Sequence, residues 1–164
     1  MIFFYTRSQK TKVFAEALHE LLNLPLYHLK SGLDDMKDFK FLIKSLGMVF
    51  SGKGFPVDNM PDSVPDEIYV CGPVWGGGFL GPHRYFLENM DLSTTKVHLI
   101  MTASMPVLKY KAKAEEMLAK INCIPGEVHL FATGKDKDFP DKDVAKEHLR
   151  DLLFGEASQQ ANTQ

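Results

Sequence analysis

Apolar runs alternate with stretches of helical periodicity along this chain, a pattern typical of parallel strands connected by crossover helices. The apolar runs predict strands at Ile2–Tyr5, Leu24–Leu29, Glu67–Gly72, Lys96–Thr102 and Glu127–Thr133. The periodic stretches predict helices at Val13–Leu22, Asp38–Phe50, Pro82–Met90, Pro106–Ile121 and Asp141–Phe154. We therefore predict an α/β fold with one parallel sheet and helices on both of its faces.

Prolines refine this prediction at two places. Pro25 lies inside the second apolar run, and proline cannot donate a hydrogen bond to a neighbouring strand, so this strand is expected at the sheet edge. The segment before the third strand contains three prolines, Pro56, Pro61 and Pro65. This segment is expected to be a linker that lies against the surface.

The length of 164 residues and the apolar content of 45% are ordinary for one domain. A chain of this size buries roughly 70% of the surface that its unfolded form exposes, which is enough for a core without disulfides or metals. We expect a single domain over residues 1–154. The polar segment 155–164 lacks periodicity and is expected to be a disordered tail.

Charge and composition exclude several classes of partner. The formal net charge is -2, whereas nucleic-acid-binding proteins concentrate basic residues on one face. No stretch reaches the ~20 apolar residues of a membrane span, so no membrane partner is expected. Cys71 and Cys123 lie far apart, in or near apolar segments, which is typical of reduced thiols and predicts a cytoplasmic protein.

The segment Val70–Gly78 is the most informative part of the chain. An apolar strand runs directly into Trp75, the single tryptophan, and then into Gly76, Gly77 and Gly78. Consecutive glycines lose much backbone entropy on folding and are favoured where another group approaches the main chain closely. The run indicates contact with a flat ligand. The alternative is a flexible loop whose tryptophan covers the core.

Ligands of a doubly wound sheet bind beyond the carboxyl ends of the strands, where the strand order reverses. Three loops are expected there, at Thr6–Thr11, Pro73–Pro82 and Thr102–Pro106. The first loop carries three hydroxyl groups directly before a helix. Hydroxyls, free N–H groups and the helix dipole can together hold a phosphate. The alternative is an ordinary helix cap made by Ser8 or Thr11.

The candidate cofactor-binding residues come from these loops, and no catalytic side chain or metal ligand is expected. The first loop supplies Thr6, Arg7, Ser8, Gln9, Lys10 and Thr11. The third-strand loop supplies Pro73, Val74, Trp75, Gly76, Gly77 and Gly78. The fourth-strand loop supplies Thr102, Ala103 and Ser104. These last three residues equally fit a turn that caps the following helix.

Other chemistry finds less support. The histidines show no metal-ligand spacing, and structural roles are expected for most of them; they are His19, His28, His83, His98, His129 and His148. There is no Gly-x-Ser-x-Gly elbow of a hydrolase. There is also no Gly-x-Gly-x-x-Gly after a strand, so no separate nicotinamide-binding domain is expected.

The loops resemble those of the flavodoxin family and its flavodoxin-like relatives. The first loop of that family commonly reads Ser/Thr-x-Thr-Gly-Asn-Thr, and its hydroxyl positions are kept at Thr6, Ser8 and Thr11. The third-strand loop often carries Pro-Val-Trp-x-Gly, matched here at Pro73, Val74, Trp75 and Gly77. The resemblance spans nearly the whole chain.

This resemblance implies a three-layer flavodoxin-like sandwich with a five-stranded sheet in the order 2-1-3-4-5. It also implies FMN at the crevice, with the phosphate on the first loop and the flavin ring between the other two loops. Trp75 would then stack on the flavin, and a peptide of the Trp75–Gly77 turn would rotate with the redox state. The protein would set which redox states are stable.

One departure from the family motif concerns the first loop, where Gln9 and Lys10 replace the usual Gly and Asn. A non-glycine residue held at positive φ is strained by about 1 kcal/mol. Our hypothesis is that Lys10 compensates by placing a positive charge on the phosphate.

Three functions are therefore considered, in this order. The first is an FMN protein that transfers electrons between redox partners and needs no catalytic side chain. The second is an NAD(P)H-dependent FMN reductase that acts on quinone-type acceptors, with His83, Arg84 or Tyr85 touching the substrate. The third is an interaction module that has lost the flavin. Flavin colour separates the third from the others, and NAD(P)H consumption with a quinone separates the second from the first.

Overall fold

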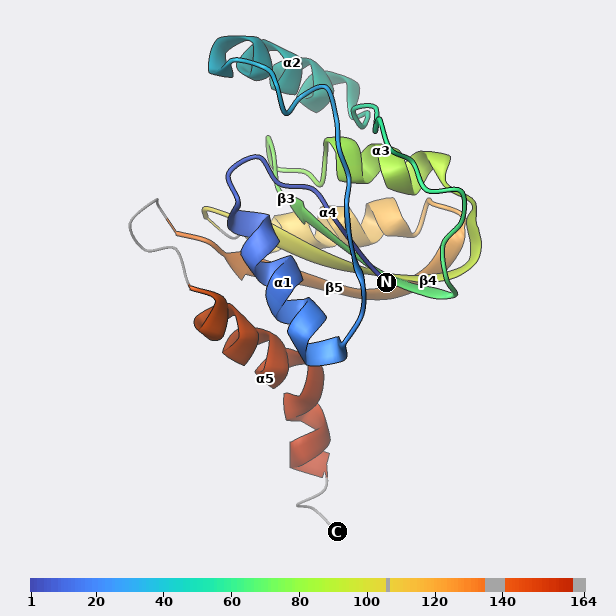
Figure 1. Cartoon of the computed structure of the whole chain (residues 1–164), viewed down its shortest axis with the longest axis vertical. Coiled ribbons are helices and arrows are strands. Elements are labelled where there is room, and N and C mark those ends of the chain that lie inside the picture. Colours follow the sequence, from blue (N-terminus) through green and yellow to red (C-terminus); the bar gives the residue numbers. More distant parts are fainter. Residues whose placement is uncertain (106, 135–140, 161–164) are drawn as a thin grey trace.

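The computed structural model of the chain describes residues 1–105, 107–134 and 141–160, with side chains described up to residue 154. These residues form one parallel sheet of five strands in the order β2-β1-β3-β4-β5. Helices cover the sheet on both faces (Figure 1). The predicted three-layer α/β sandwich and the strand order are thus confirmed.

The strands follow the apolar runs of the sequence. They are β1 (Ile2–Phe4), β2 (Leu26–His28), β3 (Glu67–Pro73), β4 (Leu92–Ala103) and β5 (Cys123–Ala132). β2 lies at the edge next to β1, as Pro25 predicted. β4 and β5 begin earlier than predicted, because the buried Leu92 pairs with Cys123 even though Ser93 and Thr94, which follow it, are exposed.

Helices α1 (Lys10–Leu22) and α5 (Lys142–Gln160) cover one face of the sheet. Phe14 of α1 and Leu149 of α5 are fully buried in the same apolar cluster, together with Ile100 of β4. The predicted apolar stripe of α1 therefore packs on the sheet, where each fully buried side chain of this size contributes roughly 1.5–3 kcal/mol.

Helices α3 (Pro82–Asn89) and α4 (Leu108–Leu118) cover the opposite face. Phe86 of α3 stacks on Phe3 of β1, with ring centroids 4.5 Å apart. Leu118 of α4 is buried in the same cluster. Pro82 lies in the first turn of α3, where its fixed φ suits the helix and its missing N–H is not needed.

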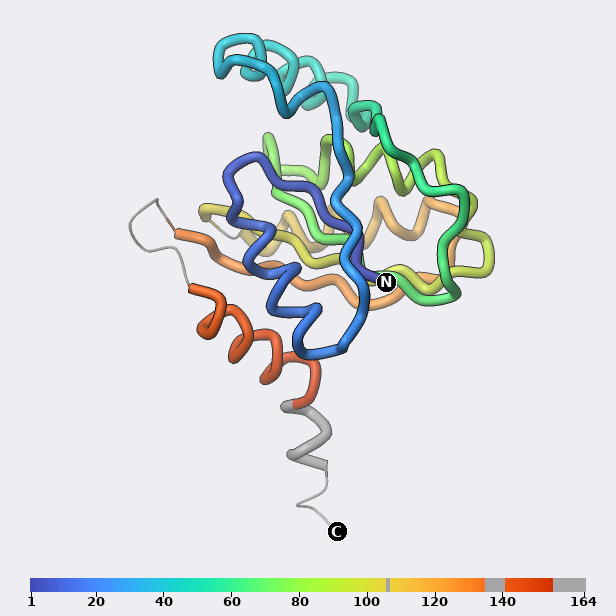
Figure 2. Tube along the Cα trace, viewed as in Figure 1, coloured from blue at the N-terminus to red at the C-terminus, as the bar shows by residue number. Residues whose placement is uncertain are grey.

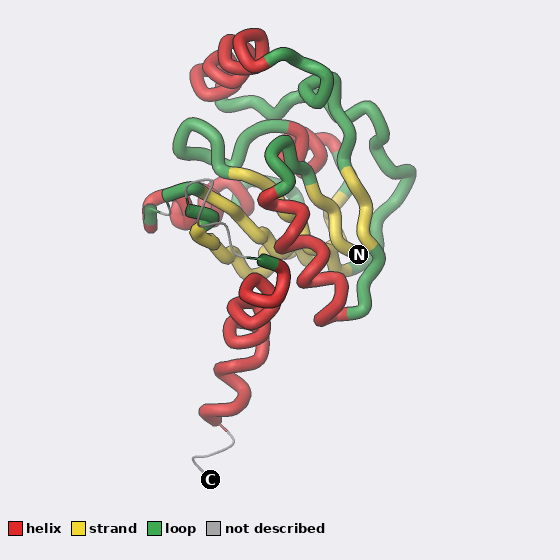
Figure 3. Tube along the Cα trace, turned by 60° about the vertical axis from the view of Figure 1, so that its left-hand side comes forward, coloured by secondary structure: helices red, strands yellow, loops and turns green. Residues whose placement is uncertain are grey.

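Helix α2 (Asp38–Ser51) has the predicted position in the chain but stands apart from the sheet (Figures 1 and 3). It ends at Gly52, which has a φ of 65° and donates its N–H to the carbonyl of Met48 at 2.8 Å. Met48 is the single buried residue of α2. No α2 residue belongs to either core cluster.

The proline-rich connector after α2 covers part of the sheet that α2 leaves open. Val57 is buried in the core cluster of the α3 and α4 face. Asn59 fastens the connector to the edge of the sheet, because its side chain donates to the carbonyl of His28 at 2.8 Å and accepts from the N–H of Lys30 at 2.7 Å. The connector lies against the surface as predicted.

Helix α5 is described as far as Gln160, so it enters the segment 155–164 for which the sequence predicts a disordered tail. Residues 161–164 lie outside the described residues, as does the predicted helix start at Pro106, and α4 begins at Leu108. A single domain over residues 1–154 stays a prediction. Within the described part of the chain, no helix is both long and apolar enough to cross a membrane.

Candidate functional site

The loops after β1, β3 and β4 lie at the same edge of the sheet (Figure 2). The hydroxyl oxygens of Thr11 and Thr102 are buried and lie 2.8 Å apart. The N–H of Val74 donates to the carbonyl of Thr102, also at 2.8 Å. These contacts bring the three predicted loops together, and they engage the Thr11 and Thr102 hydroxyls with each other.

The first loop leaves polar groups without protein partners. No side chain caps the N-terminus of α1, so the alternative in which Ser8 or Thr11 serves as its cap is wrong. The Thr6 hydroxyl is buried and has no hydrogen-bond partner among the described residues. An uncapped helix start beside an unpartnered hydroxyl is an arrangement that favours an anion.

Gln9 adopts the left-handed conformation, with a φ of 63°. The turn that glycine usually makes in this position is therefore made here by a residue with a side chain, at a cost of about 1 kcal/mol. The Nζ of Lys10 donates to the carbonyl of Gly134 at 3.3 Å. Lys10 thus carries its charge at the same edge of the sheet, between the first loop and the end of β5.

Arg7 connects the first loop to α2. Its Nη2 donates to the carbonyl of Met36 at 2.9 Å and to Oδ1 of Asp38 at 2.7 Å. The guanidinium also lies 3.9 Å from the centroid of the Phe41 ring, a favourable cation–π distance. Its Nη1 is buried and has no partner in the described part of the chain.

The glycines of the third-strand loop form a tight turn. Trp75 and Gly78 exchange two backbone hydrogen bonds of 3.0 Å each. Gly76 and Gly77 have φ values of 55° and 79°, and a type I′ turn requires positive φ at both of these positions. The peptide between them makes no backbone hydrogen bond to any described residue. The turn therefore explains both glycines and leaves this peptide free to bond elsewhere.

The ring of Trp75 is half-buried beside β1 and α2. It meets Tyr5 and Phe41 in T-shaped contacts, with centroids 5.7 and 5.1 Å apart. A Cβ added to Gly81 would lie 2.7 Å from the indole, so this side of the ring needs glycine. Trp75 covers the end of the core, as the alternative interpretation expects, and stacking of a ligand on its ring stays a prediction.

A cavity of about 420 Å³ opens between the third-strand and fourth-strand loops. Its lining includes Val74, Gly76, Gly77, Ala103 and Ser104 from the predicted set. The rest of its lining is Met105, Lys109, Tyr110 and Lys113. Five predicted residues thus border one cavity, while the first loop, Pro73, Trp75, Gly78 and Thr102 lie outside its lining.

Beyond Met105, the lining residues outside the predicted set are Lys109, Tyr110 and Lys113. They lie on α4, and the Tyr110 ring packs so closely that a Cβ at Gly77 would approach it to 3.2 Å. Their position in the first turns of the helix after β4 is the signal that sequence reasoning could have used.

A second, larger cavity of about 590 Å³ lies between α3 and α4. It shares Gly76, Gly77 and Lys113 with the first cavity. Arg84 also lines it and pairs with Glu88 at 2.8 Å. Arg84 is therefore placed beside this larger cavity rather than beside the predicted ring site.

His83 differs most from expectation, because it is fully buried and touches neither cavity. Its ring lies 4.1 Å from that of Phe79, and neither ring nitrogen has a partner among the described residues. Burial first, and then the charge of Arg84, lower the pKa of His83 to about 3. His83 is neutral at physiological pH and cannot touch a substrate in this conformation.

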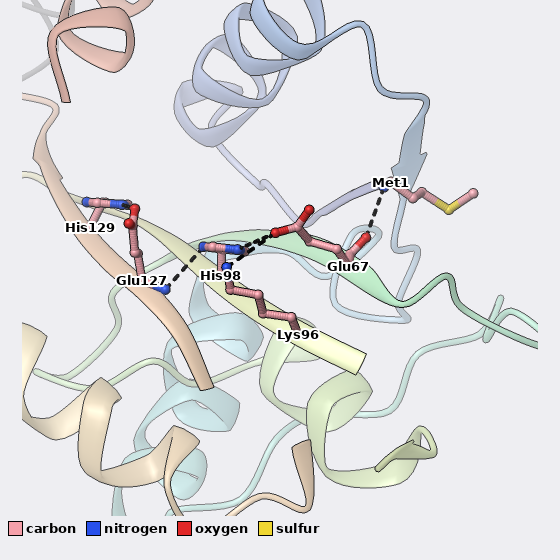
Figure 4. Close-up of polar contacts among 6 residues, drawn as sticks. All are labelled: Met1, Glu67, Lys96, His98, Glu127 and His129. Atoms are coloured by element: carbon pink, nitrogen blue, oxygen red, sulfur yellow. Dashed lines mark hydrogen bonds and ion pairs between the residues drawn. The ribbon is translucent and has the colours of Figure 1, made fainter. Parts of the chain in front are cut away.

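His98 and His129 have the structural roles that the sequence predicts (Figure 4). The Nε2 of His98 lies 3.0 Å from Oε1 of Glu67, and its Nδ1 accepts from the N–H of Glu127 at 3.1 Å. The Nε2 of His129 lies 2.9 Å from Oε2 of Glu127. Among the described residues, no group of three or more His, Cys, Asp or Glu side chains is placed to hold a metal ion.

Comparisons with known proteins identify solved structures with a similar fold. No protein-family profile matches the chain, and no curated protein sequence matches it. A candidate flavoprotein from Bacteroides uniformis is similar in structure, with a TM-score of 0.70, 16% identity, and coverage of 92% of this chain and 96% of that one. A flavoprotein from Lactobacillus acidophilus, solved in complex with FMN, has a TM-score of 0.62 and 22% identity over 79% of this chain and 90% of its own.

The Trp repressor binding protein from Bacillus subtilis is a further structural neighbour. Its TM-score is 0.54 at 13% identity, and the match covers 92% of this chain and 96% of that one. These identities are low, so the neighbours establish the architecture alone. Together with the strand order, they show that the chain has the flavodoxin-like fold.

Proposed function

We propose that this chain, which has the flavodoxin-like fold, binds FMN beyond the carboxyl ends of β1, β3 and β4 and transfers electrons between redox partners. The observation that carries the proposal is the first loop, where, among the described residues, the start of α1 has no side-chain cap and the buried hydroxyl of Thr6 has no partner. The FMN complex of the Lactobacillus neighbour supports this choice of ligand.

The residues of the first loop fit the phosphate of FMN. The N–H groups at the start of α1 and the Thr6 hydroxyl are donors that folding leaves unused, and an unpartnered buried polar group costs about 1–3 kcal/mol. A phosphate supplies acceptors for them. Arg7 contributes its unpartnered Nη1, while Lys10 and Ser8 lie in the same loop. We assign Thr6, Arg7, Ser8, Gln9, Lys10 and Thr11 to this end of the site.

The other two loops fit the flavin ring. Gly76 and Gly77 present bare backbone to the cavity that Ala103 and Ser104 border from the opposite loop. The remaining members of the proposed ring site are Pro73, Val74, Trp75, Gly78 and Thr102. Pro73 and Thr102 pair across the ends of β3 and β4, so they hold these loops at a fixed spacing.

When bound, FMN supplies one-electron and two-electron transfer, and the protein tunes it through hydrogen bonds and local charge. The Gly76–Gly77 peptide is the group best placed for tuning, because neither its N–H nor its carbonyl bonds to the backbone of any residue that the structure describes. Glycine permits both orientations of this peptide. Lys109 and Lys113 on α4 add positive charge at the same cavity, which favours a negatively charged ligand there.

The second cavity favours one alternative. It lies beside the proposed ring site and shares Gly76, Gly77 and Lys113 with it, so a small quinone-type acceptor fits there. This observation keeps an NAD(P)H-dependent reductase as the second candidate function. We place the protein in the cytoplasm, because both cysteines are free thiols and Cys71 is buried.

The test is a titration of the apoprotein with FMN, followed by quenching of flavin fluorescence, on the wild type and on Thr6→Val. Valine keeps the shape of threonine and removes the unpartnered hydroxyl. We expect Thr6→Val to weaken FMN binding about tenfold, while the free energy of unfolding of the apoprotein stays unchanged or rises. Absence of flavin binding by the wild type would reject the proposal and leave the interaction module.

A further inference from the structure

Helix α2 carries a stripe of exposed apolar side chains. Its members recur every three or four residues and therefore share one helix face; they are Phe39, Leu42, Ile43, Leu46 and Phe50. Their exposed fractions lie between 49% and 89%. Over the 11 steps from the first to the last residue, a helix advances about 16 Å. An apolar face of this size is unusual on a solvated helix and marks an interaction site.

The body of the protein does not use this stripe. The side chains that α2 turns toward the body include Met48, which is buried, and Phe41, which meets Trp75 and Arg7. Val49 also faces the body, since it lies against Gly76. Arg7 and Asp38 fix the start of the helix, and Gly52 closes its end. Arg7 thus attaches the start of α2 to the body, Val49 lies against Gly76 near its end, and the apolar stripe faces outward.

The charges around the stripe are positive. Four exposed lysines lie within or next to α2, namely Lys37, Lys40, Lys44 and Lys53. None of the four forms an ion pair among the residues the structure describes. The single acidic residue of α2, Asp38, is already paired with Arg7 at 2.7 Å. The occupant of the stripe must therefore offer negative charge around an apolar surface.

The shape of the region favours a flat occupant. α2 lies at one end of the molecule, apart from the sheet (Figures 1 and 3). A second copy docked stripe to stripe would bring four unpaired lysines of one protomer beside four of the other. An anionic bilayer instead places its acyl chains against the stripe and its headgroups beside the lysines.

We propose that α2 is an interfacial helix that docks this protein on anionic membranes. The stripe enters the boundary between headgroups and acyl chains, and the lysines lie at headgroup level. No helix among the described residues is long and apolar enough to span a bilayer, so the proposed contact is with the membrane surface only. The proposal departs from the sequence-based expectation that the chain has no membrane partner. This inference does not rest on FMN binding.

The test is co-sedimentation of the full chain with vesicles of 75% phosphatidylcholine and 25% phosphatidylglycerol, compared with vesicles of phosphatidylcholine alone. We expect binding to the anionic vesicles and much weaker binding to the neutral ones. Leu46→Ser should lower the partition coefficient about tenfold, because it removes an apolar side chain from the stripe. Lys44→Glu should lower it by a similar factor.

Two matched variants serve as controls. Ile124→Ser removes an apolar side chain that is as exposed as Leu46 but lies on β5, and Lys111→Glu reverses a charge on α4. Both should bind vesicles like the wild type. Because Leu46 is exposed, Leu46→Ser should also melt like the wild type.

The proposal is overturned if the wild type does not sediment with anionic vesicles, or if the stripe variants bind as well as the controls. Size-exclusion chromatography with light scattering tests the other occupant. A dimer that Leu46→Ser converts into a monomer would assign the stripe to a second copy of the chain. Flavin content is measured in parallel, so a failure of FMN binding is seen separately.

Discussion

The burial of His83 leads to a prediction about stability and pH. Its ring is fully buried without hydrogen-bond partners among the described residues, and burial, followed by the charge of Arg84, lowers its pKa from 6.5 to about 3. The unfolded chain therefore binds a proton below about pH 6.5 that the folded chain does not. Stability from this residue is fully present above pH 6.5 and is lost as the pH falls toward 3.

The size of this effect follows from linkage. The free energy of unfolding should fall by about 1.4 kcal/mol for each pH unit below 6.5, so by about 2.7 kcal/mol at pH 4.5. We propose to measure it by urea unfolding from pH 7.5 to 4.5. His28 and His129 also have lowered pKa values and add a slope of the same sign. The difference between the wild type and a His83 variant isolates the contribution of His83.

Two substitutions separate titration from packing. His83→Leu removes both unpartnered nitrogens, and replacing an unsatisfied buried polar group by an apolar one is close to neutral at pH 7.5. His83→Gln keeps a buried polar group that does not titrate, so this variant should have a lower free energy of unfolding at pH 7.5 than His83→Leu. Both variants should lose the additional pH slope. If His83→Leu and the wild type show the same slope between pH 6.5 and 4.5, the reasoning from burial is refuted.

Three further predictions concern the loops. Gly77→Ala should destabilise the protein by about 1 kcal/mol or more and weaken FMN binding, because its φ is 79° and the new Cβ would press on Tyr110; Gly78→Ala, whose new Cβ has ordinary contact distances, is the control in thermal melts. Gln9→Gly should stabilise the apoprotein by up to about 1 kcal/mol in urea unfolding, since the left-handed conformation is released from strain, and an unchanged or lower stability would contradict this. Lys10→Glu should raise the dissociation constant of FMN about tenfold in fluorescence titrations, and an unchanged affinity would reject the role of Lys10 at the phosphate.

Much of the architecture could be predicted from local patterns. The apolar runs and helical stripes identify the alternation of strands and helices, and Pro25 identifies the edge strand because it removes a donor. The meeting of the three loops also follows, since the carboxyl ends of neighbouring parallel strands lie at one sheet edge. These features depend on residues close together in sequence or on topology alone.

Other features depend on contacts between distant segments. The orientation of the Trp75 ring depends on its contacts with Tyr5 and Phe41. The residues near Trp75 in the sequence do not predict these contacts. The burial of His83 depends on Gly72, where a Cβ would lie 2.5 Å from its ring. A glycine inside an apolar strand was the available signal for such a close approach. The exposure of the apolar stripe of α2 could not be predicted, because periodicity predicts an amphipathic helix but does not show which other element, if any, covers its apolar face.

Arg7 links the proposed cofactor site to α2 in a way that neither motif shows alone. Its Nη2 is committed to Met36 and Asp38, and its guanidinium lies on Phe41, which in turn packs against Trp75. Its Nη1 has no hydrogen-bond partner among the described residues, and the same is true of the hydroxyl of Thr6, the preceding residue in the chain. A phosphate can therefore bind Nη1 without displacing Asp38. It would fix the guanidinium more firmly over Phe41, so filling the first loop should strengthen the attachment of α2 instead of competing with it.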